Sequence, residues 1–143
     1  MAGAAIEVDD RQVLEALSHL GQQIGDLEPV FRDMGEYLIR STRERFGQAE
    51  SPQGTPWAPL SPRYQRRKKR NIHRILVLYG DLKDSIHYSA GPRELQVGTN
   101  LIYGASHQFG RPEAGIPARP FLGLSGRDRA EVLQILRDHL AGA

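Results

Sequence analysis

Residues 80–125 read GDLKDSIHYSAGPRELQVGTNLIYGASHQFGRPEAGIPARPFLGLS, and this stretch decides how the chain folds. Ile86, Tyr88 and Ala90 alternate onto one face, residues 91–94 (Gly-Pro-Arg-Glu) form a turn, and residues 95–97 alternate back. Glycine accepts a positive φ and proline presets a negative one, which suits a four-residue turn. The pattern predicts an antiparallel β-hairpin.

Two further segments follow the hairpin. Residues 103–110 (YGASHQFG) predict a short helix that ends at Gly110, with Tyr103, His107 and Phe109 near one face. In residues 115–123 (GIPARPFLG), two prolines three residues apart exclude a helix interior and disfavour a central strand. Phe121 and Leu122 would each stabilise the fold by about 1.5–3 kcal/mol on burial. We expect them to anchor this stiff segment, either in the core or against a neighbouring subunit.

Three motifs in this region carry a family resemblance. Residues 78–86 (LYGDLKDSI) resemble L-T-G-x-L-x-x-S-I, with Tyr79 in place of Thr. Residues 103–110 resemble Y-A-x-x-H-Q-F-G, with Gly104 in place of Ala, and residues 116–123 match I-P-A-R-P-F-L-G. In this order, ahead of a C-terminal helix, the motifs resemble the phage virion morphogenesis family, the tail-completion proteins of Mu-like and related tailed bacteriophages. Upstream, residues 57–60 (WAPL) resemble the W-x-P-L element of that family.

The resemblance implies a structural protein with an α+β fold. It implies tail completion or head–tail joining through contacts with other phage tail or neck proteins, as a homo-oligomeric ring for which a hexamer is one candidate. It also implies a place in the tail or neck of the virion, after assembly in the bacterial host cytoplasm. The candidate interface or anchor residues are Trp57, Tyr103, His107, Phe109, Arg119, Phe121 and Leu122.

Length and composition predict one soluble domain over residues 1–143. It divides into a helical part (9–46), an extended Pro-rich and basic loop (47–74) and an α+β part (75–143), with the small sheet packed against the N-terminal helices and a C-terminal helix. No apolar run is long enough for a membrane span and residues 1–10 do not read as a secretory signal, so we expect no membrane contact. The absence of cysteine excludes disulfides and thiolate sites.

Two amphipathic helices are predicted in the N-terminal part. In the first, Asp9 or Asp10 is the cap and the apolar stripe holds Val13, Leu14, Leu17 and Leu20. In the second, Asp26 is the predicted cap and Pro29 falls in the first turn. Its apolar face holds Val30, Phe31, Met34, Leu38 and Phe46, and Arg40, Arg43 and Arg45 lie toward its end, where cations suit the helix dipole.

The C-terminal helix is predicted to start at a cap formed by Ser125 or Asp128. Its apolar stripe holds Val132, Leu133, Leu136 and Leu140. We expect this helix to lie across the small sheet.

A Pro-rich and basic loop lies between the N-terminal helical part and the α+β part. In this loop Trp57, the single tryptophan, is expected to anchor the loop to the domain or to a neighbouring subunit. Residues 51–80 hold seven of the 19 cations and none of the 17 acids. A solvated linker is the simplest interpretation; contact with phage DNA or an acidic subunit is the alternative, which would make the protein a non-specific nucleic-acid-binding module. The cations are Arg63, Arg66, Arg67, Lys68, Lys69, Arg70 and Arg74.

No catalytic pattern is present, so we expect no enzyme, no metal and no cofactor. The histidines lack the spacing of a helical zinc pair, and no nucleophile elbow, Walker loop or dinucleotide fingerprint occurs. Asp81 and Asp84 are interpreted as solvated capping acids and not as a metal dyad. His107 is expected to form a buried hydrogen bond that pins the segment leading to Gly110.

Overall fold

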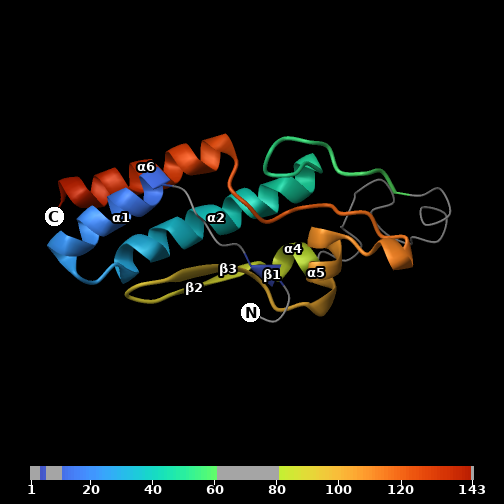
Figure 1. Cartoon of the computed structure of the whole chain (residues 1–143), viewed down its shortest axis with the longest axis horizontal. Helices are drawn as coiled ribbons and strands as arrows, with labels where there is room; N and C mark the ends of the chain where they lie inside the picture. Colours follow the sequence, from blue (N-terminus) through green and yellow to red (C-terminus); the bar gives the residue numbers. More distant parts are fainter. Residues whose placement is uncertain (1–3, 6–10, 61–80, 143) are drawn as a thin grey trace.

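The computed structural model describes residues 4–5, 11–60 and 81–142. It has the α+β fold that the sequence predicts (Figure 1). Its elements, in chain order, are β1 (Ala4–Ala5), α1 (Arg11–Ile24), α2 (Glu28–Gln48), α4 (Asp81–Asp84), β2 (His87–Ala90), β3 (Leu95–Thr99), α5 (Ile102–Phe109), the short 3-10 helix η1 (Pro112–Ala114) and α6 (Gly126–Ala141).

The predicted hairpin forms the centre of a small antiparallel sheet. β2 pairs with β3 from His87 opposite Gly98 to Ala90 opposite Leu95, and the amide of Gly91 donates to the carbonyl of Glu94 at 2.9 Å to close the turn. β1 adds two residues on the other side of β3, so the strand order is β1-β3-β2. Because β3 is central, its last three residues are buried.

Helix α2 covers the sheet. At Gly35 it lies so close to the hairpin that an added Cβ would stand 2.5 Å from Cγ of the Tyr88 ring. The face of α2 predicted to be apolar is buried, including Val30, Phe31 and Phe46. A glycine on this face therefore lets an aromatic side chain of β2 pack directly on the helix backbone.

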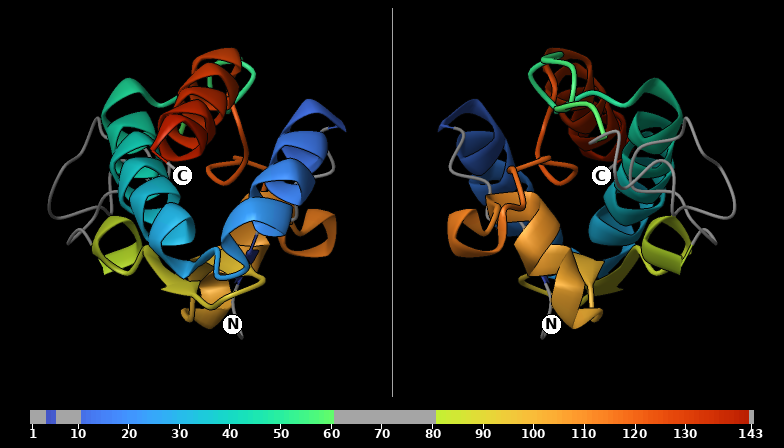
Figure 2. Two further views of the ribbon diagram at one scale, coloured as in Figure 1. Left: turned by 90° about the vertical axis from the view of Figure 1, so that its left-hand side faces the viewer. Right: turned by 90° about the vertical axis from the view of Figure 1, so that its right-hand side faces the viewer.

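Helix α6 does not lie across the sheet, so that expectation is wrong. It packs against α1 and α2, on the side of these two helices away from the strands (Figure 2). The apolar stripe of α6 is real, since Val132 and Leu136 are buried. The sheet face on the core side is already covered by α2, so the remaining apolar surface for α6 is that of α1 and α2.

The predicted helix starts need small corrections. α2 begins after Leu27, and the Asp26 carboxylate accepts from the amide of Glu28 at 2.9 Å from one residue before the cap position. At α6 both predicted caps take part. The Ser125 hydroxyl accepts from the amide of Asp128 at 3.0 Å, and the Asp128 carboxylate accepts from the amide of Ser125 at 3.0 Å, which forms a capping box.

One predicted position in α1 differs in burial, and the loop after α2 differs in its start. In α1, Val13 and Leu20 are buried as expected, but Leu14 is 46% exposed. The loop that was expected to extend from residue 47 instead begins after Gln48 and folds back on itself, since the amide of Ser51 donates to the carbonyl of Thr55 at 2.8 Å. Within the described ranges, no helix is both long and apolar enough to cross a bilayer.

Candidate interaction site

The proline-bracketed run lies in the core of the subunit. Phe121 is fully buried and Leu122 is 3% exposed. The Phe121 ring packs on Phe46 of α2 at 5.6 Å between ring centroids, and Trp57 meets the same Phe46 edge-on at 5.5 Å. The sequence left open whether Phe121 and Leu122 belong to the core or to an interface; in the structure their side chains fill the space between α2, α5 and the Trp57 loop.

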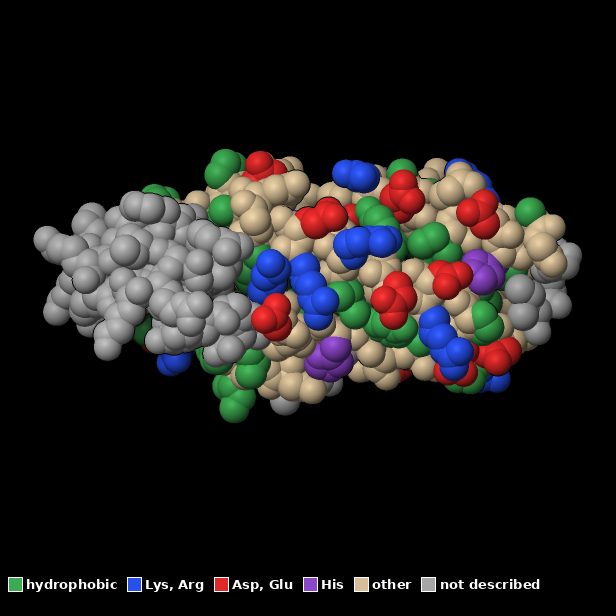
Figure 3. All heavy atoms as spheres, turned by 180° about the vertical axis from the view of Figure 1, so that it is seen from behind, with side chains coloured by type: hydrophobic (Ala, Val, Ile, Leu, Met, Phe, Trp, Pro, Cys, Tyr) green, Lys and Arg blue, Asp and Glu red, His purple; other side chains and the backbone are tan. Residues whose placement is uncertain are grey.

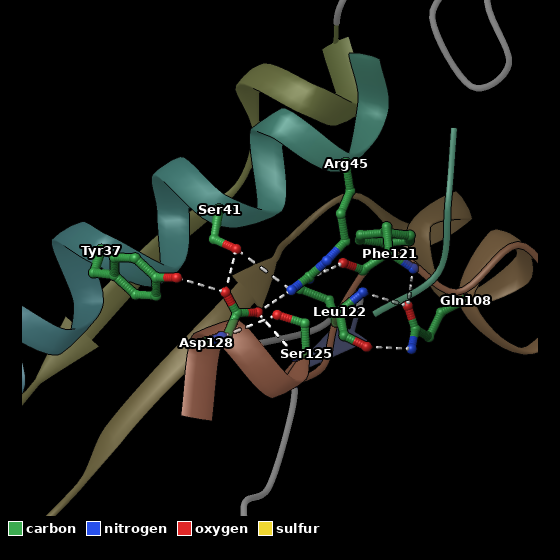
Figure 4. Close-up of polar contacts among 8 residues, drawn as sticks. All are labelled: Tyr37, Ser41, Arg45, Gln108, Phe121, Leu122, Ser125 and Asp128. Carbon is green, nitrogen blue, oxygen red and sulfur yellow. Dashed lines mark hydrogen bonds and ion pairs between the residues drawn. The ribbon is translucent and has the colours of Figure 1, made fainter. Parts of the chain in front are cut away.

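Gln108 of α5 holds the backbone of this run (Figure 4). Its side-chain carbonyl accepts from the amides of Phe121 at 2.9 Å and Leu122 at 3.0 Å, and its side-chain amide donates to the carbonyl of Leu122 at 3.1 Å. A segment with prolines at 117 and 120 has no neighbouring strand, so its polar backbone groups need side-chain partners. The Gln108 side chain supplies both a donor and an acceptor, so it forms the backbone hydrogen bonds that a neighbouring strand would otherwise provide.

His107 lies next to it, and within the described residues its side chain does not form the expected hydrogen bond. Nδ1 is buried without a hydrogen-bond partner in the described part of the chain, and burial together with the charge of Arg119 lowers the His107 pKa. The contact at this position is made by the backbone instead, because the carbonyl of His107 accepts from the amide of Arg119 at 2.7 Å. The pinning role predicted for the His107 side chain therefore belongs to the Gln108 side chain and to the backbone of His107.

A buried ion pair holds the same run from the other side. Arg45 of α2 is 5% exposed, donates to the carbonyl of Phe121 at 2.8 Å, and pairs with Asp128 of α6, which is 1% exposed. Asp128 also accepts from the hydroxyls of Tyr37, at 2.9 Å, and Ser41 (Figure 4). Sequence reasoning placed Arg45 on the helix end for its effect on the dipole and missed this role.

The electrostatics of this cluster follow from burial and its polar contacts. Burial alone would raise the pKa of Asp128, but hydrogen bonds from Ser125, Ser41 and Tyr37 and the charge of Arg45 outweigh it, so its pKa lies below the ordinary value. Burial and the adjacent carboxylate raise the pKa of Tyr37 to about 12. The Asp128 carboxylate is thus held ionised. Its contacts with Arg45, Tyr37 and Ser41 connect α6 to α2 beside Phe121.

Arg119 and Trp57 fix the loop that leads to the basic run. The Arg119 guanidinium donates to the carbonyls of Ala58 at 2.8 Å and Pro59 at 3.0 Å, and the Trp57 indole donates to the carbonyl of Pro120 at 2.7 Å. Both side chains are buried. They join residues 57–59 to residues 119–120 within one subunit.

The remaining residues predicted to contact a partner are either exposed on α5 or lie outside the residues that the structure describes. Tyr103 is 43% exposed and Phe109 is 70% exposed on α5, where Tyr103 meets the His107 ring edge-on at 6.1 Å. Ile102, which the sequence analysis did not single out, is 81% exposed on the same helix. All seven cations of the basic run lie outside the described residues: Arg63, Arg66, Arg67, Lys68, Lys69, Arg70 and Arg74.

The face of the molecule in Figure 3 carries side chains of both charges. On the face shown in Figure 3, Lys and Arg side chains alternate with Asp and Glu side chains and with small apolar areas. Among the described residues, no group of three or more His, Cys, Asp or Glu side chains is placed to hold a metal ion.

Comparison with known proteins connects this geometry to one family. The sequence model of the phage virion morphogenesis family matches residues 8–141. The chain is 32% identical to the "Putative capsid assembly protein G" of Escherichia phage Mu, over 96% of this chain and 94% of that protein. It is 30% identical to the Mu-like prophage FluMu G protein 2 of Haemophilus influenzae, over 94% of each chain, and 26% identical to the "Tail completion protein S" of Escherichia phage P2, over 90% of each. No solved structure matches the chain.

Proposed function

The chain belongs to the phage virion morphogenesis family, and on that premise we propose that it is a structural protein of phage assembly that acts in tail completion or head–tail joining. The observation that carries the proposal is the family match over residues 8–141, together with relatives of similar length named for capsid assembly and tail completion. Its partners are other phage tail or neck proteins and further copies of itself in a ring. It is assembled in the host cytoplasm and stays in the tail or neck of the virion.

The described side chains support a role in protein contacts. The charged side chains of Arg45, Asp128 and Arg119 are buried, and each forms an ion pair or hydrogen bonds with other groups of the same subunit. Among the described residues, three of the four exposed large apolar side chains, by contrast, lie on α5: Ile102, Tyr103 and Phe109. Exposed aromatic and aliphatic side chains on a small protein are typical of surfaces that bind another protein. The function follows from binding and not from catalysis.

A gene deletion tests the proposal. A phage or prophage that lacks this gene should yield heads and tails that stay unjoined, or tails of abnormal length, when lysates are viewed by electron microscopy. The wild-type gene supplied on a plasmid should restore infectious particles. If the deletion mutant makes intact, infectious particles at the wild-type titre, the assembly function is wrong.

The alternative function, non-specific nucleic-acid binding, rests on the seven cations without an acid in residues 51–80. Counterion release makes such binding steeply dependent on salt. Replacing Arg66, Arg67, Lys69 and Arg70 by Gln should abolish particle completion if DNA binding is the function. On our proposal the variant loses retention on DNA and still completes particles.

A further inference from the structure

The outer side of β2 is an open edge of the sheet. β2 lies last in the strand order β1-β3-β2 and forms the lower edge of the sheet in Figure 1, where no described strand pairs with its outer side. Proteins usually protect such an edge with a charged side chain, a proline or a β-bulge. The sequence of β2, HYSA, has no Lys, Arg, Asp, Glu or Pro, and its pairing with β3 has no bulge. Only the shortness of β2 limits further pairing.

The hydrogen bonding of the hairpin shows which backbone groups of β2 point toward β3. The amide of Gly91 donates to the carbonyl of Glu94 at 2.9 Å, so these two residues form a hydrogen-bonded pair next to the turn. Antiparallel strands alternate between hydrogen-bonded and non-hydrogen-bonded pairs. By this alternation, the N–H and C=O groups of His87 and Ser89 point toward β3.

The residues between them, Tyr88 and Ala90, therefore direct their N–H and C=O groups outward. A separate contact supports this alternation one step earlier in the chain, because Arg43 of α2 donates from outside the sheet to the carbonyl of Ile86 at 3.2 Å. No described residue forms a hydrogen bond with the outward groups of Tyr88 and Ala90. These two donors and two acceptors in a row are what an extended chain pairs with when it adds a strand to a sheet.

This edge is held in place by α2 and the residue before it. At the start of the edge, Arg43 binds the carbonyl of Ile86. In the middle, the Tyr88 hydroxyl donates to the Glu36 carboxylate at 2.9 Å, and at the turn the amide of Leu27 donates to the carbonyl of Pro92 at 3.1 Å. A surface that is ordered before a partner binds loses less conformational entropy on binding.

We propose that the outer edge of β2 binds an extended segment of another virion protein, which adds a strand to the sheet. This inference rests on the proposed assembly function and names the surface and the kind of partner. The segment pairs with the backbone of Tyr88 and Ala90 and carries a carboxylate beside Ile86. The carboxylate fits because the Arg43 side chain is exposed, and its Nε and Nη1 donors form no hydrogen bond with the described residues.

Pairing of two β2 strands from two copies of this chain is the other way to satisfy the same backbone groups. Such a pair has twofold symmetry and closes after two copies. It would use up the edge without connecting the chain to another part of the particle, which the proposed function requires. An unlike segment makes that connection.

Hydrogen exchange at single-residue resolution tests the inference on the full-length protein, first free and then in completed particles. In the free protein, the amides of His87 and Ser89 should be protected and those of Tyr88 and Ala90 should exchange rapidly. In particles, the exchange of Tyr88 and Ala90 should slow by about tenfold or more, because each amide gains a hydrogen bond. Docking through side chains alone would not produce protection at these alternate residues.

A proline variant tests whether the outward amide is needed. Ala90→Pro removes only an outward N–H, and an edge strand tolerates proline at such a position. We expect this variant to keep the wild-type circular dichroism and to lose completion of particles in the complemented deletion phage. Ser89→Pro removes an N–H that bonds β3 and should destabilise the hairpin. The control Arg11→Pro, at the first position of α1 where proline is tolerated, should complete particles at the wild-type yield.

A charge variant tests the predicted carboxylate of the partner. Arg43→Gln keeps hydrogen-bond donors near the Ile86 carbonyl and removes the positive charge, so it should lower the yield of completed particles. Arg40→Gln removes an exposed charge of the same helix away from the edge and should keep the wild-type yield. Arg43→Gln at the wild-type yield would overturn the assignment of a carboxylate to the partner.

Three other results would overturn the proposed strand addition. The first is exchange of the Tyr88 and Ala90 amides that is equally fast in the free protein and in particles. The second is a folded Ala90→Pro protein that completes particles at the wild-type yield. The third is protection of both amides in the free protein together with the mass of a dimer, which would identify a second copy as the occupant. If Ala90→Pro does not fold, the exchange measurement on the wild type decides. None of these results changes the assembly function, which the gene deletion tests separately.

Discussion

Gln108 and His107 are neighbours in one motif with opposite environments. The motif singles out both residues, but adjacent positions on a helix point about 100° apart, so the sequence alone does not tell which side chain meets the Phe121 run. The structure gives three hydrogen bonds to Gln108 and leaves Nδ1 of His107 without a partner in the described chain. The role of Gln108 could have been predicted from two features of the sequence. The segment with Pro117 and Pro120 has backbone groups that need partners, and Gln108 in the preceding motif can both donate and accept hydrogen bonds.

We expect Gln108→Ala to lower the free energy of unfolding by about 1–3 kcal/mol, since it leaves two amides and one carbonyl of residues 121–122 without partners. Urea denaturation of the purified protein measures the change. Gln134→Ala is the matched control, because Gln134 is exposed on α6 and bonds only Asp138 among the contacts described; its effect should stay within about 0.5 kcal/mol. Equal effects of the two variants would show that Gln108 does not hold the run.

Asp128 gives the protein a predictable response to acid. Its pKa is lowered in the folded state, so the unfolded chain binds the proton first as pH falls. Its contribution to stability is therefore fully present above the unfolded pKa of about 3.9 and is lost as pH drops through the lower folded value. Asp128→Asn leaves Arg45 buried without its counter-charge, which costs about 3–5 kcal/mol at neutral pH.

The measurement is the free energy of unfolding at about pH 7 and about pH 3, where the Asn variant should lose less stability than the wild type. Glu113→Gln serves as a control. The Glu113 pKa is also lowered, by its own backbone amide and by Arg111, but the side chain is exposed. A Glu113 variant that removed the acid dependence, or an Asp128 variant that kept all of it, would contradict this account.

At the scale of elements, local sequence patterns predicted the helices and strands, but they did not predict every packing contact between them. Alternation gives the hairpin, a positive φ at Gly110 ends α5, and capping residues mark the start of α6. The predicted position of α6 was wrong. An apolar stripe shows that one face of a helix is buried, but it does not show which element covers that face. Which helix covers the sheet depends on Gly35 and Tyr88, residues distant in sequence whose contact has no local signal.

Gly104 tests how closely α5 packs on the sheet. The related motif has Ala at this position, but here a Cβ would stand 2.6 Å from the methyl group of Thr99, whose hydroxyl is held by Ser85 and by the amide of Leu101. We expect Gly104→Ala to destabilise by about 1–3 kcal/mol despite its better helix propensity. Adding Thr99→Ser removes the methyl group, keeps the hydroxyl, and should recover most of the loss in a double-mutant cycle.

Gly47 is the control for Gly104. It lies in α2, and an added Cβ would meet nothing within 4 Å. Gly47→Ala should therefore stabilise the protein by up to about 1 kcal/mol, measured as a shift in the denaturation midpoint. A stabilising Gly104→Ala would mean that Thr99 can move aside and that the contact between α5 and β3 is looser than described.

For the whole molecule, the sequence identified the segments that matter but did not separate folding from assembly. Phe109 and Phe121 stand in adjacent motifs and both were predicted as interface or anchor residues. The structure buries Phe121 completely and leaves Phe109 70% exposed. Composition cannot make this distinction, because the exposure of Phe109 depends on which side of α5 packs on the core, and that is the side that carries Gly104.

The two phenylalanines therefore predict opposite phenotypes for the same substitution. Phe121→Ala should cost about 3–5 kcal/mol and unfold much of the monomer, since it opens a cavity beside Phe46 and Trp57. Phe109→Ala should change the free energy of unfolding by no more than about 0.5 kcal/mol, since its side chain is already largely in solvent, and should still lower the yield of completed particles. Denaturation of the purified variants and plating of the complemented deletion phage give the two readouts. A Phe109→Ala protein as unstable as Phe121→Ala would place Phe109 in the fold, and one that completes particles at the wild-type yield would remove α5 from the assembly surface.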